Sequence, residues 1–290
     1  MGATKNIEGG VGLGTMLKAA LPAVPVLNRV PGVKKSGSAL PDLTLTTSGT
    51  VERDKVAAYN RVCGFATKDT APITYLHMLA FPLHMALMTD ASFPFVALGM
   101  VHLENSITQH RRVGYGEKVD FALLAENLRP HARGKLFDMN VTAQVGDEVV
   151  WESTSSYLRM GRGDKEHGDP GTIFNDVEAG GIPWKLPEDL GRRYGAVSGD
   201  RNPIHLYPIT AKALGFPRHI AHGMWSKARC LAQIENRLPA AVRVDVGFKK
   251  PIFLPGTVTF GLAEGDTGLD FALRNPKDGS PHLLGRTRAL

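Results

Sequence analysis

The segment 196–205 (AVSGDRNPIH) contains a carboxylate and an imidazole five positions apart. Asn202 and Pro203 between them favour an irregular loop, on which Asp200 and His205 can approach each other without helical spacing. Such a pair can share one water molecule: Asp200 would accept one proton, while His205 orients the water or accepts the other. The alternative is an Asx turn at Asp200, with His205 as an ordinary polar residue.

A second segment that could take part in a reaction is 220–225 (IAHGMW), where a long helix is predicted to begin near His222 and Gly223. The backbone N–H of a glycine in a first helical turn has no partner within the helix and has the helix dipole behind it. Such a donor suits an oxygen that gains negative charge during a reaction. The alternative is that Gly223 only allows close packing. We interpret His222 as structural, and Asn202 either holds the loop or contacts a ligand.

No residue pattern indicates a cofactor or a metal. The sequence has ten histidines, and none stands at ligand spacing from cysteine or carboxylate partners. The glycine-rich stretch 9–14 does not follow a strand, so it is interpreted as a flexible terminus rather than a phosphate-binding loop. We therefore expect no metal and no cofactor.

The chain divides into two blocks of similar length. Residues 1–45 are rich in small residues and are predicted to be a flexible lead-in, and the polar, glycine-rich run within 162–178 is typical of a linker. The blocks are then 46–161 and 179–290. Each begins with a helix-like stretch, continues through an irregular segment and a longer helix, and ends in strands with period-two alternation.

The order of residues is also shared by the two blocks, which indicates an internal duplication. Four segments of the first block match segments of the second in the same order: 59–65 with 194–200, 72–74 with 203–205, 82–85 with 221–224, and 101–107 with 242–248.

In the second block the long helix carries apolar residues at steps of three and four, which predicts one buried face containing Trp225 and extending to Leu238. Four strands are predicted after it, at 242–248, 257–263, 269–274 and 282–289, separated by turn residues. One long helix wrapped by an antiparallel sheet is an α+β arrangement.

The string around Asp200 resembles the signature of the MaoC-like, (R)-specific enoyl-CoA hydratase family. The matching residues are Ser198, Gly199, Asp200, Asn202, Pro203, Ile204, His205 and Ala211. The resemblance implies a hot-dog fold, with Asp200 and His205 as the catalytic pair and Gly223 as the contact to the thioester oxygen. With the two-block architecture included, the resemblance covers about residues 45 to 290. It then implies a double hot-dog (3R)-hydroxyacyl-thioester dehydratase. The substrate would be an acyl-CoA or an acyl chain on an acyl carrier protein.

The first block departs from that pattern. In the sequence match, Phe65 stands where Asp200 would be, Thr74 where His205 would be, and Met85 where Gly223 would be. This block is therefore predicted to be a degenerate hot dog that cannot run the reaction. We expect its former site to have become apolar lining that favours medium or long acyl chains.

The composition sets the wider context. A hydrophobic fraction of 43%, no long apolar run and only two cysteines predict a cytoplasmic protein without a membrane span. The net charge of +6 is scattered and lacks interleaved aromatic residues, so nucleic acid is not expected as a partner. A positive net charge would suit an anionic thioester carrier, and equally a basic surface without a role. A homodimer is compatible with the sequence.

Two other functions use the same ligand class. An acyl-thioesterase would cleave the thioester instead of hydrating the double bond, and the lack of another placed carboxylate disfavours it. A non-catalytic acyl-thioester-binding protein would need no acid–base pair, so an Asp200 or His205 side chain turned away from the pocket would favour it.

Overall fold

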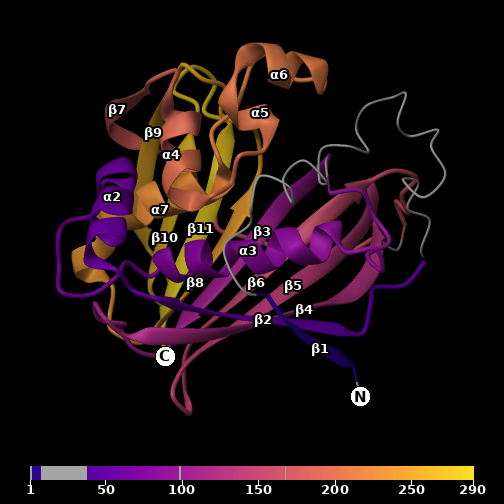
Figure 1. Ribbon diagram of the computed structural model, residues 1–290. Helices are drawn as coiled ribbons and strands as arrows, with labels where there is room; N and C mark the ends of the chain where they lie inside the picture. Colours follow the sequence, from indigo (N-terminus) through magenta and orange to yellow (C-terminus); the bar gives the residue numbers. More distant parts are fainter. Residues whose placement is uncertain (1, 8–37, 98, 167) are drawn as a thin grey trace.

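The computed structural model describes residues 2–7, 38–97, 99–166 and 168–290. Its dominant feature is a single curved sheet with helices lying against it (Figure 1). Within the described ranges, no helix is long and apolar enough to cross a membrane. The glycine-rich stretch 9–14 lies outside the described residues.

The elements follow the order that the two blocks predict. The helices are α2 (Arg53–Cys63), α3 (Tyr75–Thr89), α4 (Leu190–Ser198), α5 (Pro203–Leu206), α6 (Pro208–Ala213), α7 (Gly223–Ile234) and the 3-10 turn η3 (Glu235–Arg237). The strands of the first part of the chain are β1 (Ala3–Asn6), β2 (Leu43–Thr50), β3 (Met100–Gln109), β4 (Lys118–His131), β5 (Gly134–Val145) and β6 (Glu148–Met160). Those of the second part are β7 (Gly180–Leu186), β8 (Val242–Phe248), β9 (Gly256–Glu264), β10 (Leu269–Arg274) and β11 (Pro281–Ala289).

The strand order of the sheet has an internal symmetry. It runs β1-β2-β4-β5-β6-β3-β8-β11-β10-β9-β7, so beyond β1 the order β2-β4-β5-β6-β3 is mirrored by β7-β9-β10-β11-β8. Each set contains one long central helix, α3 or α7, preceded by a shorter one, α2 or α4. This arrangement is a double hot-dog fold and confirms the predicted fold class.

The two halves join where β3 and β8 pair antiparallel, with Asn105 opposite Val246. A buried lysine of α7 anchors this seam: Lys227 Nζ donates to Asn105 Oδ1 at 2.6 Å, to the Asn105 carbonyl at 3.1 Å and to the Val244 carbonyl at 3.0 Å. Burial holds the pKa of Lys227 well below its usual value. Three oxygen acceptors surround the amine and satisfy its donors, so the side chain can stay in the core.

The predictions for the second block are largely confirmed. The predicted strands at 242–248 and 269–274 coincide with β8 and β10. The predicted strand at 257–263 is two residues shorter than β9, and the one at 282–289 is one residue shorter than β11. Trp225 is buried, as predicted, and its indole donates to the carbonyl of Val62 at 3.1 Å. The helix is shorter than predicted, because α7 ends at Ile234 and Leu238 follows a 3-10 turn.

The regions outside the two blocks contain some regular structure. Residues 3–6, which the sequence assigns to the lead-in, form β1 and pair parallel with β2. Between Met160, where β6 ends, and Gly180, where β7 begins, the described residues form neither helix nor strand.

The symmetry corrects part of the sequence match between the blocks. Gly64 and Gly199 both end their helices in the left-handed conformation, so Phe65 occupies the place of Asp200, as predicted. The amide of Ala71 bonds to the carbonyl of Val113, just as the amide of Ala221 bonds to that of Ile252. The start of α3 therefore corresponds to the start of α7.

Two equivalences of the sequence match are consequently wrong. Thr74 is the N-cap of α3 and so lies at the start of the central helix rather than at the place of His205, and Met85 lies in the third turn of α3 rather than at the place of Gly223. The match failed because α5, which carries His205, and α6 have no counterpart in the first half, where residues 66–70 make a short connection. Motif similarity could not reveal this insertion.

Candidate active site

Two glycines on one face of α4 let the segment with the acid–base pair lie directly against the helix. A Cβ on Gly191 would overlap the carbonyl oxygen of His205, and one on Gly195 would lie 2.8 Å from the carbonyl oxygen of Asp200. Gly199 then ends α4 at φ 76° and turns the chain into the loop. These glycines therefore position the pair.

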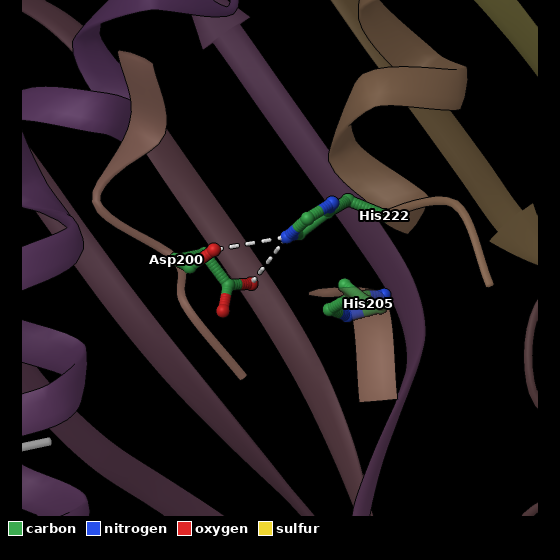
Figure 2. Close-up of side chains that lie close together, drawn as sticks. All are labelled: Asp200, His205 and His222. Carbon is green, nitrogen blue, oxygen red and sulfur yellow. Dashed lines mark hydrogen bonds and ion pairs between the residues drawn. The ribbon is translucent and has the colours of Figure 1, made fainter. Parts of the chain in front are cut away.

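The carboxylate of Asp200 is oriented by its own loop. The Asp200 N–H donates to Ser198 Oγ at 3.1 Å, and Asp200 Oδ1 accepts from the backbone N–H of Asn202 at 3.1 Å. The Asx turn considered as an alternative is thus present, and it directs Oδ2 toward the neighbouring histidines (Figure 2). The side chain is 27% exposed, so the carboxylate remains accessible.

His205 lies on a short helix rather than on the loop where the sequence placed it. Asn202 Oδ1 accepts from the Ile204 N–H at 3.3 Å and caps α5, whose first residue is Pro203. His205 Nδ1 lies 2.8 Å from the carbonyl oxygen of Ile220, which can only accept. Nδ1 therefore carries the proton, and Nε2 presents a lone pair.

His222 belongs to the site, although the sequence interpretation made it structural. Its Nε2 donates to the Asp200 carbonyl at 3.0 Å and lies 3.8 Å from Asp200 Oδ2. Its ring stacks on that of His205, with centroids 3.8 Å apart. Figure 2 shows all three side chains converging, with His222 bridging from the start of α7 to the Asp200 loop. His222 thus positions both members of the pair.

Burial keeps both imidazoles neutral. It lowers the pKa of His205, against the opposing effects of the Asp200 charge and the Ile220 carbonyl. It also lowers the pKa of His222 to about 3, assisted by His205. At neutral pH, His205 Nε2 is therefore free to accept a hydrogen bond or a proton.

Gly223 is the first residue of α7 and follows His222, the N-cap. Its backbone N–H is one of the first-turn donors that have no acceptor within the helix. The ring of Phe248 covers it closely: a Cβ on Gly223 would lie 3.1 to 3.3 Å from three ring atoms. A side chain at position 223 would therefore press on Phe248, so glycine is the residue that fits here.

We expect Gly223→Ala to lower kcat/KM about 10- to 100-fold, since small displacements at a reacting centre have effects of this size. The methyl group would press on Phe248 and narrow the approach to the amide. Alanine suits a helix, so the melting temperature should change little. Steady-state kinetics and thermal unfolding of the variant test this, and unchanged kcat/KM would exclude an oxygen contact at Gly223.

The three site residues also form the one group among the described residues whose ligand atoms could reach a common metal ion, since these atoms lie within 4.8 Å of one another. Their orientation fits a metal poorly. The His205 and His222 rings are stacked with an interplanar angle of 26°, so their in-plane lone pairs do not converge on one point. The arrangement suits proton transfer better.

The structure thus brings together Asp200, His205 and Gly223, which the sequence selected, and assigns Asn202 a capping role. His222 was missed. The available signal was its position directly before Gly223 at a helix start, where an N-cap side chain must lie near the preceding loops.

A carboxylate that converges with a neutral imidazole beside a helix N-terminus, in a double hot-dog fold, defines a class of enzymes that act on acyl thioesters by general acid–base catalysis.

Comparison with known proteins agrees with this class. Residues 176–271 match the model of the MaoC like domain. The chain is 40% identical over 282 residues to 3-hydroxyacyl-thioester dehydratase X of Mycobacterium tuberculosis, covering 96% of this chain and 98% of that protein. The crystal structure of HtdX from the same organism superposes with a TM-score of 0.75 at 41% identity, covering 85% of this chain and 100% of that one.

Two more distant proteins were found. A mitochondrial 3-hydroxyacyl-[acyl-carrier-protein] dehydratase of Arabidopsis thaliana is 32% identical over 93 residues, which cover 31% of this chain and 52% of that protein. A MaoC-like dehydratase from Phytophthora capsici shares the fold, with a TM-score of 0.71 at 18% identity over 90% of this chain and 98% of that one. The chain therefore belongs to the MaoC-like dehydratase family.

Proposed function

We propose that this protein is a hydro-lyase of fatty-acid metabolism that interconverts trans-2-enoyl and (3R)-hydroxyacyl thioesters. The observation that carries the proposal is the convergence of the Asp200 carboxylate with a neutral His205 whose Nε2 is free to accept. Membership of the family and the near full-length relationship to a 3-hydroxyacyl-thioester dehydratase support it.

The pair can activate a water molecule directly. One water can donate one hydrogen bond to the Asp200 carboxylate and one to His205 Nε2, which leaves an oxygen lone pair directed outward. In hydration, that oxygen bonds to C3 as the pair removes a proton, and a proton is delivered to C2. Dehydration follows the same steps in reverse. No proton is gained or lost by the enzyme over a turnover.

Gly223 would stabilise the charge that this addition creates. As water bonds to C3, electrons move toward the thioester and its oxygen becomes enolate-like. The backbone N–H of Gly223, with the dipole of α7 behind it, is a fixed donor for that oxygen. It costs no reorganisation at the moment of reaction.

The thioester carrier is coenzyme A or an acyl carrier protein, and no further cofactor takes part in this mechanism. We place the protein in the cytoplasm, with no nucleic-acid partner, and a homodimer fits the proposal. We keep the domain division that the sequence suggested, with a lead-in at 1–45, a degenerate hot dog at 46–161, a linker at 162–178 and a catalytic hot dog at 179–290, except that β1 and the start of β2 extend the sheet of the first hot dog into the lead-in.

This division predicts one catalytic site per chain. In the first half Phe65 replaces the acid, and the short connection 66–70 provides no residue in place of His205. Calorimetric titration of the Asp200→Asn variant with a trans-2-enoyl-CoA should give one equivalent bound per chain. A stoichiometry of two would contradict the proposed degeneration of the first half.

The function is tested by giving the purified protein trans-2-enoyl-CoA and following both the loss of the conjugated double bond and the release of free thiol. The proposal predicts hydration without thiol release. Thiol release at a comparable rate would indicate a thioesterase, and binding without either reaction would indicate a non-catalytic acyl-thioester-binding protein.

A further inference from the structure

Three histidines of the first half form a cluster that the proposed reaction does not use; His77 and His84 are buried, and His102 is half-buried. His77 and His84 lie two turns apart on α3, with ring centroids 5.1 Å apart, and His102 lies on β3. Four of their ring nitrogens are buried without a hydrogen-bond partner among the described residues: Nδ1 of His77, both nitrogens of His84 and Nε2 of His102.

Aromatic rings connect this cluster to the active site. The ring of His102 lies 5.0 Å from that of Phe248, which covers Gly223. It also stacks on Tyr157 at 4.5 Å, and Tyr157 is 6.2 Å from His84. The Asp200 charge contributes to raising the pKa of Tyr157, after burial, so this ring lies within electrostatic reach of the catalytic carboxylate.

The fold directs these side chains to the seam. The pairing of β3 with β6 shifts register between His102 and Glu104, and such a bulge re-aims the side chain beside it. His77 also lies within electrostatic reach of Lys227, the lysine that anchors the seam from α7. The histidines of the first half are thus separated from Gly223, at the start of α7, by the single ring of Phe248.

This finding changes the expectation of an apolar lining. Burial lowers the pKa of His84 and of His102 to about 3, so both rings are neutral and each offers one donor and one acceptor. Buried polar groups without partners are rare, because each loses its hydrogen bonds to water. Leucine or phenylalanine at these positions would suit a plain alkyl chain better than three imidazoles.

We propose that the acyl chain of the substrate carries a hydroxyl group remote from the thioester, and that His77, His84 and His102 receive it. A hydroxyl is both donor and acceptor, as is a neutral imidazole, so it can satisfy two of the unpaired nitrogens at once. This inference rests on the proposed hydratase function and names the class of substrate for the same site.

The experiment compares pairs of trans-2-enoyl-CoA thioesters of equal chain length, one plain and one with a single hydroxyl, placed at successive carbons from C6 to C12. The wild-type protein should prefer the hydroxylated member about tenfold in kcat/KM at one position of the hydroxyl, which is the effect of one well-made neutral hydrogen bond. His84→Leu should abolish the preference, so that the plain and the hydroxylated chain have equal kcat/KM, and His84→Gln should keep part of the preference.

A matched control separates recognition from packing. Leu83→Met changes the neighbouring, fully buried residue of α3 without changing polarity, so its preference should equal that of the wild type. Equal kcat/KM for plain and hydroxylated chains at every position would overturn this inference alone, as would a His84→Leu variant that keeps the preference. Failure of the wild type to hydrate any of the thioesters would overturn the proposed function, and the inference with it.

Discussion

Asp200→Asn and His205→Gln should each lower kcat 10²- to 10⁴-fold, which is the usual contribution of a positioned acid–base group. Asparagine keeps the Oδ1 that accepts from the Asn202 N–H, so the loop should hold its shape while the proton acceptor is lost. Glutamine at 205 removes the imidazole lone pair that faces the water. Stopped-flow or steady-state hydration of an enoyl-CoA measures both effects.

Two variants far from the site serve as matched controls. Asp266→Asn and His110→Gln make the same chemical changes at exposed positions, and both should turn over like the wild type. Circular dichroism should show that all four variants are folded. Near-wild-type turnover in either Asp200→Asn or His205→Gln would remove the mechanism.

Acid should destabilise this protein more steeply than buried carboxylates alone would. The folded-state pKa values of His84 and His222 are lowered to about 3 and that of His77 is lowered well below its usual value, in each case first by burial. In the unfolded chain a histidine titrates near 6.5. Between these values the unfolded state binds protons that the folded state refuses, so stability is complete above about pH 6.5 and falls as the pH falls.

The expected slope is about 1.4 kcal/mol per pH unit for each histidine, so about 4 kcal/mol per unit for the three together. Over two or three pH units, the loss of unfolding free energy would be comparable with the whole stability of a typical domain. Urea unfolding at pH 7, 6, 5 and 4.5 measures the slope. His84→Gln removes one of the three histidines and should therefore lower the slope by about 1.4 kcal/mol per pH unit. A free energy of unfolding that stays constant from pH 6.5 to 4.5 would contradict the neutral burial of these rings.

The sequence was most informative where local pattern and tertiary role coincide. The strands β8 to β11 are apolar segments separated by turn residues, so their bounds followed from the sequence, although β10 is buried throughout and does not alternate. Asp200 and His205 stood in a long and specific motif, and Gly223 stood at a recognisable helix start. The duplicated order of elements likewise predicted the symmetric sheet.

The missed features depend on contacts between distant segments. His222 acts through a stacked ring and a bond to a carbonyl 22 positions earlier, and no local pattern encodes such a pairing. The insertion of α5 and α6 shifted the sequence match, so Thr74 and Met85 were assigned to the wrong places. The histidines of α3 and β3 are separated by at least 18 positions and meet only because the helix packs across the sheet.

The configuration of the product tests the central claim most directly. Purified protein should convert a trans-2-enoyl-CoA to 3-hydroxyacyl-CoA that is entirely the (3R) enantiomer on chiral chromatography, and Asp200→Asn should form almost none of it in the same time. The fixed positions of the acid–base pair and of the Gly223 amide predict a single enantiomer, and the resemblance to (R)-specific hydratases predicts that it is (3R). A (3S) or racemic product, or (3R) product formed equally fast without the Asp200 carboxylate, would contradict the account.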